Sequence, residues 1–219
     1  MSSTLEAPNS FFAYAAHELR TPLATQRALL ELALADPSAD VGAWREIGED
    51  VLGACRQQER LLEACLTLAR SDGTPIRCEP ADLAEIAADA LRAQDLGGLD
   101  SVAVLEPAWT SGEPELLERL AANLVSNAVR HNVAGGRVVV GTRGVAGLAC
   151  LTVANTGPVV PAGELRRLFQ PFQRAGATTG VGLGLAIVQA ISDAHHAALN
   201  ARTRPGGGLE ITVAFGGLH

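Results

Sequence analysis

The stretch AYAAHELRTPLATQ places reactive side chains directly before a proline. His17, Glu18 and Thr21 supply an imidazole, a carboxylate and a hydroxyl, and Pro22 follows them. On a helix, Thr21 lies one turn beyond His17 on the same face. A proline inside a helix removes a hydrogen bond and bends the axis. Taken alone His17 is most simply a surface histidine, but a bend beside titratable groups makes this turn a candidate reactive site.

A pair of asparagines forms a second candidate site. Asn123 and Asn127 are four residues apart in an otherwise apolar stretch, so both amides face the same way on a helix. Buried amides need polar partners. The partners are either neighbouring backbone groups, which is the simpler explanation for the pair alone, or Mg²⁺, which binds few protein oxygens and keeps water and phosphate around it.

Two glycine-rich turns complete the chemical candidates. Asn155 and Gly157 stand in NTGPVVP at the end of a predicted strand, while Gly180, Gly182 and Gly184 open a predicted helix. Backbone N–H groups at a helix N-terminus favour phosphate oxygens. Such a turn alone is weak evidence for phosphate binding, and it is not a Walker loop because no Gly-Lys-Ser/Thr follows.

The elements that must position these residues fall into two predicted domains, 1–73 and 74–219. The first reads as a helical hairpin, with one helix over 9–35 that breaks at Pro22 and a second that Asp40 caps. Its apolar stripes need a partner, so two copies are expected to form a four-helix bundle.

The second domain follows the linker SDGTP and mixes helices with strands, which predicts an α+β sandwich with helices on one face of a sheet. The predicted helices cover 82–96, 113–132 and 182–197, and the predicted strands cover 101–106, 136–143, 148–155, 198–204 and 208–215.

Composition excludes some classes of function. The 219 residues carry a net charge of −7, with a sequence pI near 5.2, which argues against a nucleic-acid partner. No run approaches the roughly 18 apolar residues of a membrane span, and no signal peptide is visible, so a cytoplasmic location is expected.

The order of these motifs resembles the catalytic core of sensor histidine kinases, which belong to the GHKL superfamily. HELRTPL matches the H box of the phosphoacceptor domain without a departure, and the later motifs match the N, G1, F and G2 boxes of the ATP-binding domain. The matching residues are, in that order, Asn123 and Asn127, Asn155 and Gly157, Phe169 and Phe172, and Gly180, Gly182 and Gly184.

This resemblance implies ATP-dependent autophosphorylation of His17 and transfer of the phosphoryl group to an Asp of a response regulator. Glu18 would hold the other ring nitrogen of the imidazole, and Thr21 would position water for a phosphatase reaction. The implied cofactors are ATP and Mg²⁺, with Asn127 as the metal ligand. The residues implied to bind the nucleotide are Asn123, Asn127, Arg130, His131, Asn155, Gly157, Gly180, Gly182, Leu183 and Gly184.

The resemblance also implies a fold and partners. The fold would be a dimeric four-helix bundle followed by a GHKL (Bergerat) α/β sandwich. The partners would be a second copy, through the hairpin, and the receiver domain of a response regulator. The chain itself would carry no membrane segment, although a longer parent protein would be membrane-anchored.

Four positions depart from the family pattern. Asn155 stands where the G1 box usually has Asp, so an amide without charge assistance would accept the hydrogen bond from the adenine amino group. Val159 replaces a G1 glycine and would restrict the loop near the base. Arg130 and His131 replace the usual Lys and Tyr, and Arg130 keeps a cation for phosphate.

Two other functions remain open from the sequence. Asn155 and Val159 would fit a degenerate kinase that acts as a nucleotide-binding scaffold or as a phosphatase without kinase turnover. A GHKL ATPase or serine kinase of the anti-sigma type is the third alternative, and the intact H box argues against it.

Overall fold

The computed structural model describes residues 7–71, 76–173 and 182–218. Its contacts divide the chain into two compact units, Met1–Leu66 and Thr67–His219, which are treated separately below. The predicted domain boundary, between residues 73 and 74, lies outside the described residues.

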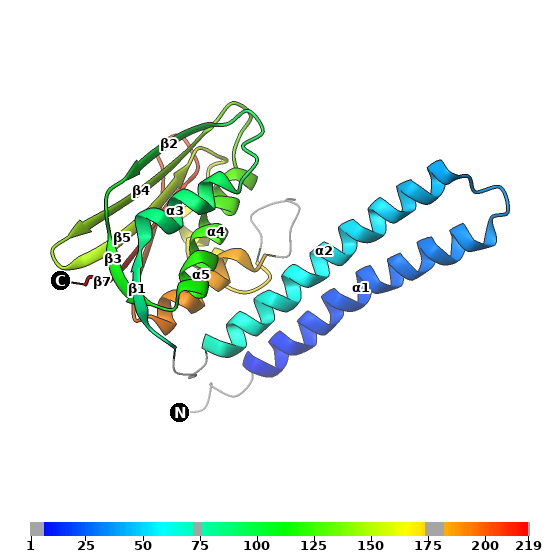
Figure 1. Ribbon diagram of the computed structural model, residues 1–219, viewed down its shortest axis with the longest axis horizontal. Coiled ribbons are helices and arrows are strands. Elements are labelled where there is room, and N and C mark those ends of the chain that lie inside the picture. Colours follow the sequence, from blue (N-terminus) through cyan, green and yellow to red (C-terminus); the bar gives the residue numbers. More distant parts are fainter. Residues whose placement is uncertain (1–6, 72–75, 174–181, 219) are drawn as a thin grey trace. The chain divides into compact units, whose positions relative to one another are not determined.

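The first unit is a helical hairpin of α1 (Ala7–Ala35) and most of α2 (Val41–Ser71), shown in Figure 1. The predicted break at Pro22 is wrong, because α1 continues through the proline. The proline removes a single backbone hydrogen bond. The other hydrogen bonds of this long helix and its packing against α2 outweigh that loss. In the described parts of the chain no helix is long and apolar enough to cross a bilayer.

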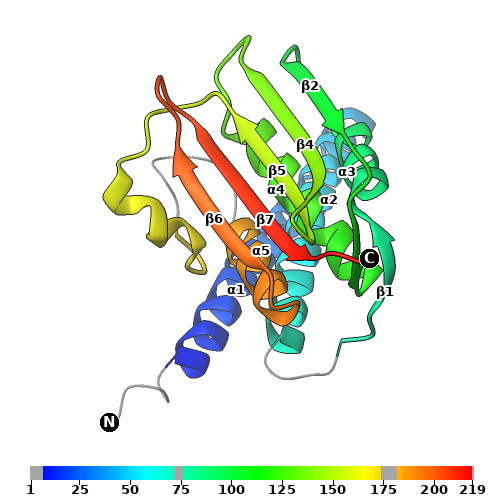
Figure 2. The ribbon, with the colours of Figure 1, turned by 90° about the vertical axis from the view of Figure 1, so that its left-hand side faces the viewer.

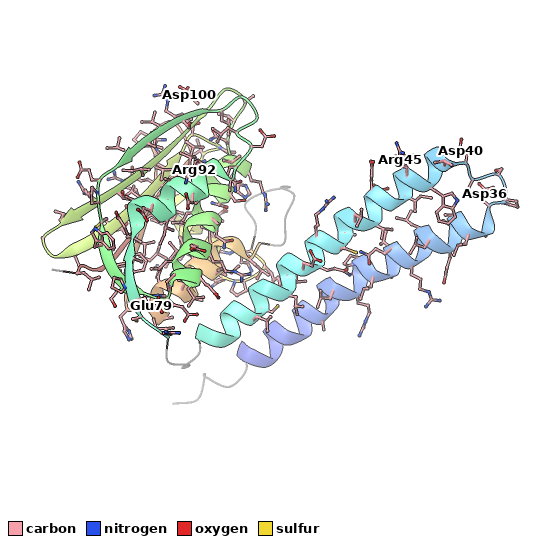
Figure 3. All side chains as sticks on the ribbon, in the orientation of Figure 1. Asp36, Asp40, Arg45, Glu79, Arg92 and Asp100 are labelled. Atoms are coloured by element: carbon pink, nitrogen blue, oxygen red, sulfur yellow. The ribbon has the colours of Figure 1, made fainter. Side chains whose placement is uncertain are left out.

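The connection between α1 and α2 is built from side-chain caps (Figure 3). Asp40 Oδ1 accepts a hydrogen bond from Ala43 N at 2.9 Å, which confirms the predicted cap of the second helix. Asp36 Oδ1 accepts bonds from the backbone N–H and the hydroxyl of Ser38, at 2.8 and 2.6 Å. These bonds hold the pKa of Asp36 below its usual value.

The second unit contains a five-stranded sheet in the order β2-β4-β5-β7-β6. The strands are β2 (Asp100–Leu105), β4 (Arg137–Val145), β5 (Leu148–Asn155), β6 (Ala198–Thr203) and β7 (Leu209–Gly216). Only β2 and β4 pair in parallel, and the other neighbours are antiparallel. Each predicted strand is therefore confirmed to within a few residues.

Three helices cover one face of this sheet, as Figure 2 shows from the strand side. They are α3 (Leu83–Arg92), α4 (Pro114–Arg130) and α5 (Gly184–Ala194). The predicted sandwich is therefore confirmed, although α3 ends four residues earlier than expected, before a turn in which Gly97 and Gly98 have positive φ.

The core lies between the inner sheet face and the helices. Alternate residues of β4, β5 and β7 point inward, and the helices contribute apolar stripes. The largest side chains that are almost fully buried include Val138, Val140, Leu151, Val213 and Phe215 from strands, and Leu117, Leu120, Leu124, Val188 and Ile191 from helices.

Two four-residue strands and a short helix were not predicted. β1 (Glu79–Asp82) pairs with β3 (Trp109–Gly112) in a separate two-stranded sheet, and a 3₁₀ helix spans Ala162–Phe169. Asp82 ends β1 and caps α3, because its Oδ1 accepts a bond from Ala84 N. The same oxygen accepts a bond from Ala108 N, just before β3. Such short strands carry too little periodicity to be recognised in a sequence.

Candidate nucleotide and phosphoacceptor sites

The two asparagines lie side by side on α4, which begins with Pro114 at its first turn. Both are half-buried beside the apolar stripe of the helix. Asn123 Nδ2 donates to Arg119 O at 2.8 Å, so its amide nitrogen bonds to the backbone of its own helix. The carbonyl oxygen of Asn127 accepts a bond from His131 N at 3.0 Å, whereas its side-chain amide has no hydrogen bond to the described residues, which leaves the amide oxygen available to a cation.

The start of α5 lies against this asparagine face. A Cβ at Gly184, the first residue of α5, would stand 3.3 Å from Asn123 Oδ1. The helix N-terminus with its N–H groups is therefore next to the amide oxygen of Asn123. Leu183 precedes it and is buried, with its carbonyl accepting a bond from Ile187 N.

A backbone contact joins the F box to the G2 box. Phe172 N donates to Gly182 O at 2.9 Å, and both residues have positive φ, 64° and 73°. A Cβ at Gly182 would stand 2.7 Å from Gln173 O, so only glycine fits there. Gly180, predicted to bind phosphate, lies outside the described residues.

The end of β5 supplies a second wall of the site. Asn155 is 5% exposed, and its Nδ2 donates to Thr156 O at 2.6 Å and to His131 O at 3.3 Å. Two carbonyl oxygens can only be satisfied by the NH₂ group, so they fix which way the amide faces. The Oδ1 atom is thereby left as an acceptor on the other side.

In the turn after Asn155, Gly157 is packed too closely for a side chain. A Cβ at Gly157 would stand 2.6 Å from His131 O. The β6–β7 hairpin lies directly against this turn, since Gly208 N donates to Pro158 O at 3.0 Å and a Cβ at Gly208 would collide with Asn155 O. Val159, expected to restrict the loop, is 77% exposed.

Sequence reasoning missed this supporting role of Gly208. The sequence predicts strands over 198–204 and 208–215 and assigns no role to the glycines of PGGG between and at the start of them. The available signal was the number of consecutive glycines, because a two-residue hairpin turn needs at most two residues with positive φ. In the structure Gly206, Gly207 and Gly208 all have positive φ, between 87° and 100°.

A polar network joins the end of α4 to the end of β5, and sequence reasoning missed it too. Thr156 Oγ1 donates to Asn132 Oδ1 at 2.6 Å and accepts from Arg137 N at 2.7 Å. Asn132 Nδ2 donates to Ala128 O at 3.1 Å. These bonds hold the helix and the strand end at a fixed separation, so they position His131 O beside Asn155.

Arg130 and His131 end α4 at this wall. Arg130 is exposed in the last turn, and His131 is half-buried at the C-cap. Burial, with a smaller contribution from the charge of Arg130, lowers the pKa of His131. The imidazole therefore stays neutral more readily than a free histidine, and Arg130 is the cation that this edge of the site presents.

The phosphoacceptor candidates lie in the other unit. The backbone of His17, Glu18 and Thr21 is helical within α1, which places Thr21 one turn beyond His17. Thr21 is exposed, and its carbonyl accepts a bond from Thr25 Oγ1 at 3.2 Å. The nucleotide-site candidates that the structure describes thus lie in one unit, and the H-box residues lie in the other.

Comparison with known proteins agrees with this division. Residues 9–74 match the His Kinase A (phospho-acceptor) domain, and residues 112–216 match the histidine kinase-, DNA gyrase B- and HSP90-like ATPase family. Together the two matches cover well over half of the chain.

Two relatives and one solved structure of similar fold extend over nearly the whole chain. Sensor protein CutS of Streptomyces coelicolor is 45% identical over 219 residues, covering 95% of this chain and 53% of CutS. The histidine-protein kinase/phosphatase MprB of Mycobacterium tuberculosis is 35% identical over 224 residues, covering 93% and 43%. Histidine kinase ThkA, solved in complex with response regulator protein TrrA, is 18% identical with a TM-score of 0.70, covering 94% and 60%.

The chain spans about half the length of the curated relatives it matches. Both family matches fall in the order that the boxes predict, and CutS and MprB align across both of them. The chain therefore belongs to the sensor histidine kinases and contains their phosphoacceptor and ATPase core.

Proposed function

We propose that this chain binds ATP and Mg²⁺ in its second unit, autophosphorylates on His17 and passes the phosphoryl group to an aspartate of a response regulator. The convergence of α4, the end of β5 and the start of α5 carries this proposal. Those three elements supply amide oxygens, a buried acceptor and a helix N-terminus next to one another.

The base end of the site centres on Asn155. Its Nδ2 is held by two backbone carbonyls, so Oδ1 is the atom that meets a ligand. A carbonyl-type acceptor pairs with the exocyclic amino group of adenine and repels the carbonyl oxygen that hypoxanthine carries at the same place. Adenosine triphosphate should therefore bind about tenfold more tightly than inosine triphosphate, and Asn155→Ala should remove most of that difference.

The phosphate end lies at the start of α5. N–H groups of this helix N-terminus, beside Gly184, would donate hydrogen bonds to phosphate oxygens. Asn127 would ligate Mg²⁺ through its amide oxygen, together with water and phosphate. The cation would neutralise charge on the phosphates during transfer.

The reaction itself would take place on α1. The neutral imidazole of His17 would attack the γ-phosphorus, forming an N–P bond as the bond to the ADP oxygen breaks. Glu18 would accept a hydrogen bond from the other ring nitrogen. Thr21, one helical turn on, would orient water for hydrolysis of the phosphorylated regulator, which agrees with MprB being named a kinase/phosphatase.

The hairpin would supply the partner surfaces. Its exposed large apolar side chains include Leu23, Leu30, Leu32, Leu34, Leu52, Leu62 and Leu66. A second copy would cover part of this surface in a four-helix bundle. A response regulator is the expected second partner, as TrrA is for ThkA. Because ATP and such regulators are cytoplasmic, the core would act there.

The test is incubation with γ-labelled ATP and Mg²⁺, followed by treatment with acid, which hydrolyses phosphohistidine. Label should appear and be acid-labile. It should be absent in His17→Gln, which still binds nucleotide, and in Asn127→Ala, which does not bind nucleotide in a Mg²⁺-dependent way. Acid-stable label, or label that survives His17→Gln, would contradict the proposal by placing the acceptor elsewhere. No label at all would also contradict it and would favour the scaffold or phosphatase alternative.

A further inference from the structure

The interior of the α1–α2 hairpin contains a pair of side-chain amides. Gln26 is 8% exposed, and among the described residues of this unit it is the one polar side chain that is buried. Its Nε2 lies 3.3 Å from Gln58 Oε1 and 3.4 Å from both Val51 O and Cys55 Sγ of α2. A primary amide has two N–H donors, so these acceptors of α2 share them.

The second amide returns to α1. Gln58 Nε2 donates to Leu19 O at 3.4 Å. Leu19 stands three residues before Pro22, which lacks an N–H and whose ring presses on the carbonyl four residues back. That turn of α1 is therefore the one whose backbone bonds the proline disturbs. Gln58 supplies a donor from α2 at this disturbed turn.

The two amides together form a link that begins and ends on α1. It runs from Leu19 O through Gln58 to Gln26, and Pro22 lies between these two ends in the sequence. His17 lies two residues before Leu19. We propose that Gln26 and Gln58 are positioning residues that hold the phosphoacceptor turn of α1 against α2 for transfer to His17. This proposal rests on the proposed function of His17.

Stability does not require amides at this place. Replacing both partners of a buried hydrogen bond by apolar groups of similar shape is nearly neutral or stabilising. The bonds of 3.3 and 3.4 Å are also longer than the usual range, so each contributes little to folding. The pair contributes to alignment, because a buried polar pair fixes the register between two packed helices, whereas apolar contacts do not.

The test uses the whole chain with Gln26→Leu, Gln58→Leu and the double variant. The control is Arg27→Ala, since Arg27 neighbours Gln26 but is exposed and pairs only with exposed Glu31 among the described residues. The initial rate of autophosphorylation at saturating ATP should fall about tenfold or more in each Gln variant. The KM for ATP should not change, and the melting temperature should stay equal or rise.

The double variant should be no slower than the slower single variant, because both substitutions break the same link. Rates within about twofold of the unaltered chain would overturn the proposal. A fall in rate that is matched by a lower melting temperature would overturn it too, since that is the result of damaged packing. Additive losses in the double variant would show two independent roles and would also contradict it.

Hydrogen exchange separates this proposal from the function of His17. Amides over 19–25 should exchange faster in Gln58→Leu than in the unaltered chain, and Arg27→Ala should leave them unchanged. If the unaltered chain takes no label from γ-labelled ATP, the kinase proposal fails. The exchange rates would still show whether the link through Gln58 holds this turn of α1. Equal exchange in all variants would mean that Gln58 does not hold this turn.

Discussion

Asn155→Asp would introduce the residue that the family usually carries. From the sequence alone, we expect this substitution to increase the affinity for adenine. The structure predicts that the substitution lowers the folding stability. Asn155 Nδ2 donates to the carbonyl oxygens of Thr156 and His131, at 2.6 and 3.3 Å, and the residue is 5% exposed. An ionised carboxylate has no hydrogen to donate, so it would face two carbonyl oxygens across a buried contact.

The magnitude follows from those two contacts. Two lost hydrogen bonds cost about 1–3 kcal/mol together, and repulsion between buried oxygens brings the expected loss of unfolding free energy to about 2–4 kcal/mol. Burial and repulsion also raise the pKa of the introduced carboxyl above its unfolded value. The protonated form can again donate one bond, so the penalty is full above the raised pKa and shrinks as the pH falls through it.

The assay is urea unfolding of the two proteins at about pH 8 and about pH 5, with Asn200→Asp as the control. Asn200 is exposed on β6, so the same change of charge should have little effect there. The difference between Asn155→Asp and the unaltered protein should be larger at the higher pH. Equal stability of the two at both pH values would refute the argument, because the amide nitrogen would then not face the carbonyls.

Three further substitutions test other parts of the second unit. Gly208→Ala should cost about 3 kcal/mol or more, since it meets Asn155 O, while Gly206→Ala, with a similar φ but open space, should cost about 1 kcal/mol in the same urea assay. His195→Ala should cost about 2–4 kcal/mol, because Nε2 accepts from Glu113 N at 3.1 Å and the ring fills the space beside Gly112. The lowered pKa of His131 disfavours protonation of the folded form, so stability should fall as the pH drops below about 6.5, and His131→Asn should flatten that dependence.

Much of the fold and the site could be predicted because its signals are local. The Asp40 cap, the five strands of the main sheet and the order of the glycine turns depend on residues close in sequence. The expected break at Pro22 was wrong for the opposite reason, since contacts with α2 outweigh a local rule. The bond from Thr156 to Asn132 joins segments 24 residues apart, and a sequence carries no periodicity that would reveal it.

The structure also bears on the alternative of a degenerate, inactive nucleotide-binding module. Its support came from Asn155 and Val159. Val159 is 77% exposed, so its side chain does not pack into the turn after Asn155. Asn155 satisfies its amide nitrogen with two backbone carbonyls and retains the oxygen as an acceptor, which is the hydrogen-bonding role that the usual Asp would have toward adenine. Under the proposed function, Asn155 Oδ1 would accept the hydrogen bond from adenine while two backbone carbonyls orient the amide, so Asn155 and Val159 do not by themselves argue for an inactive module.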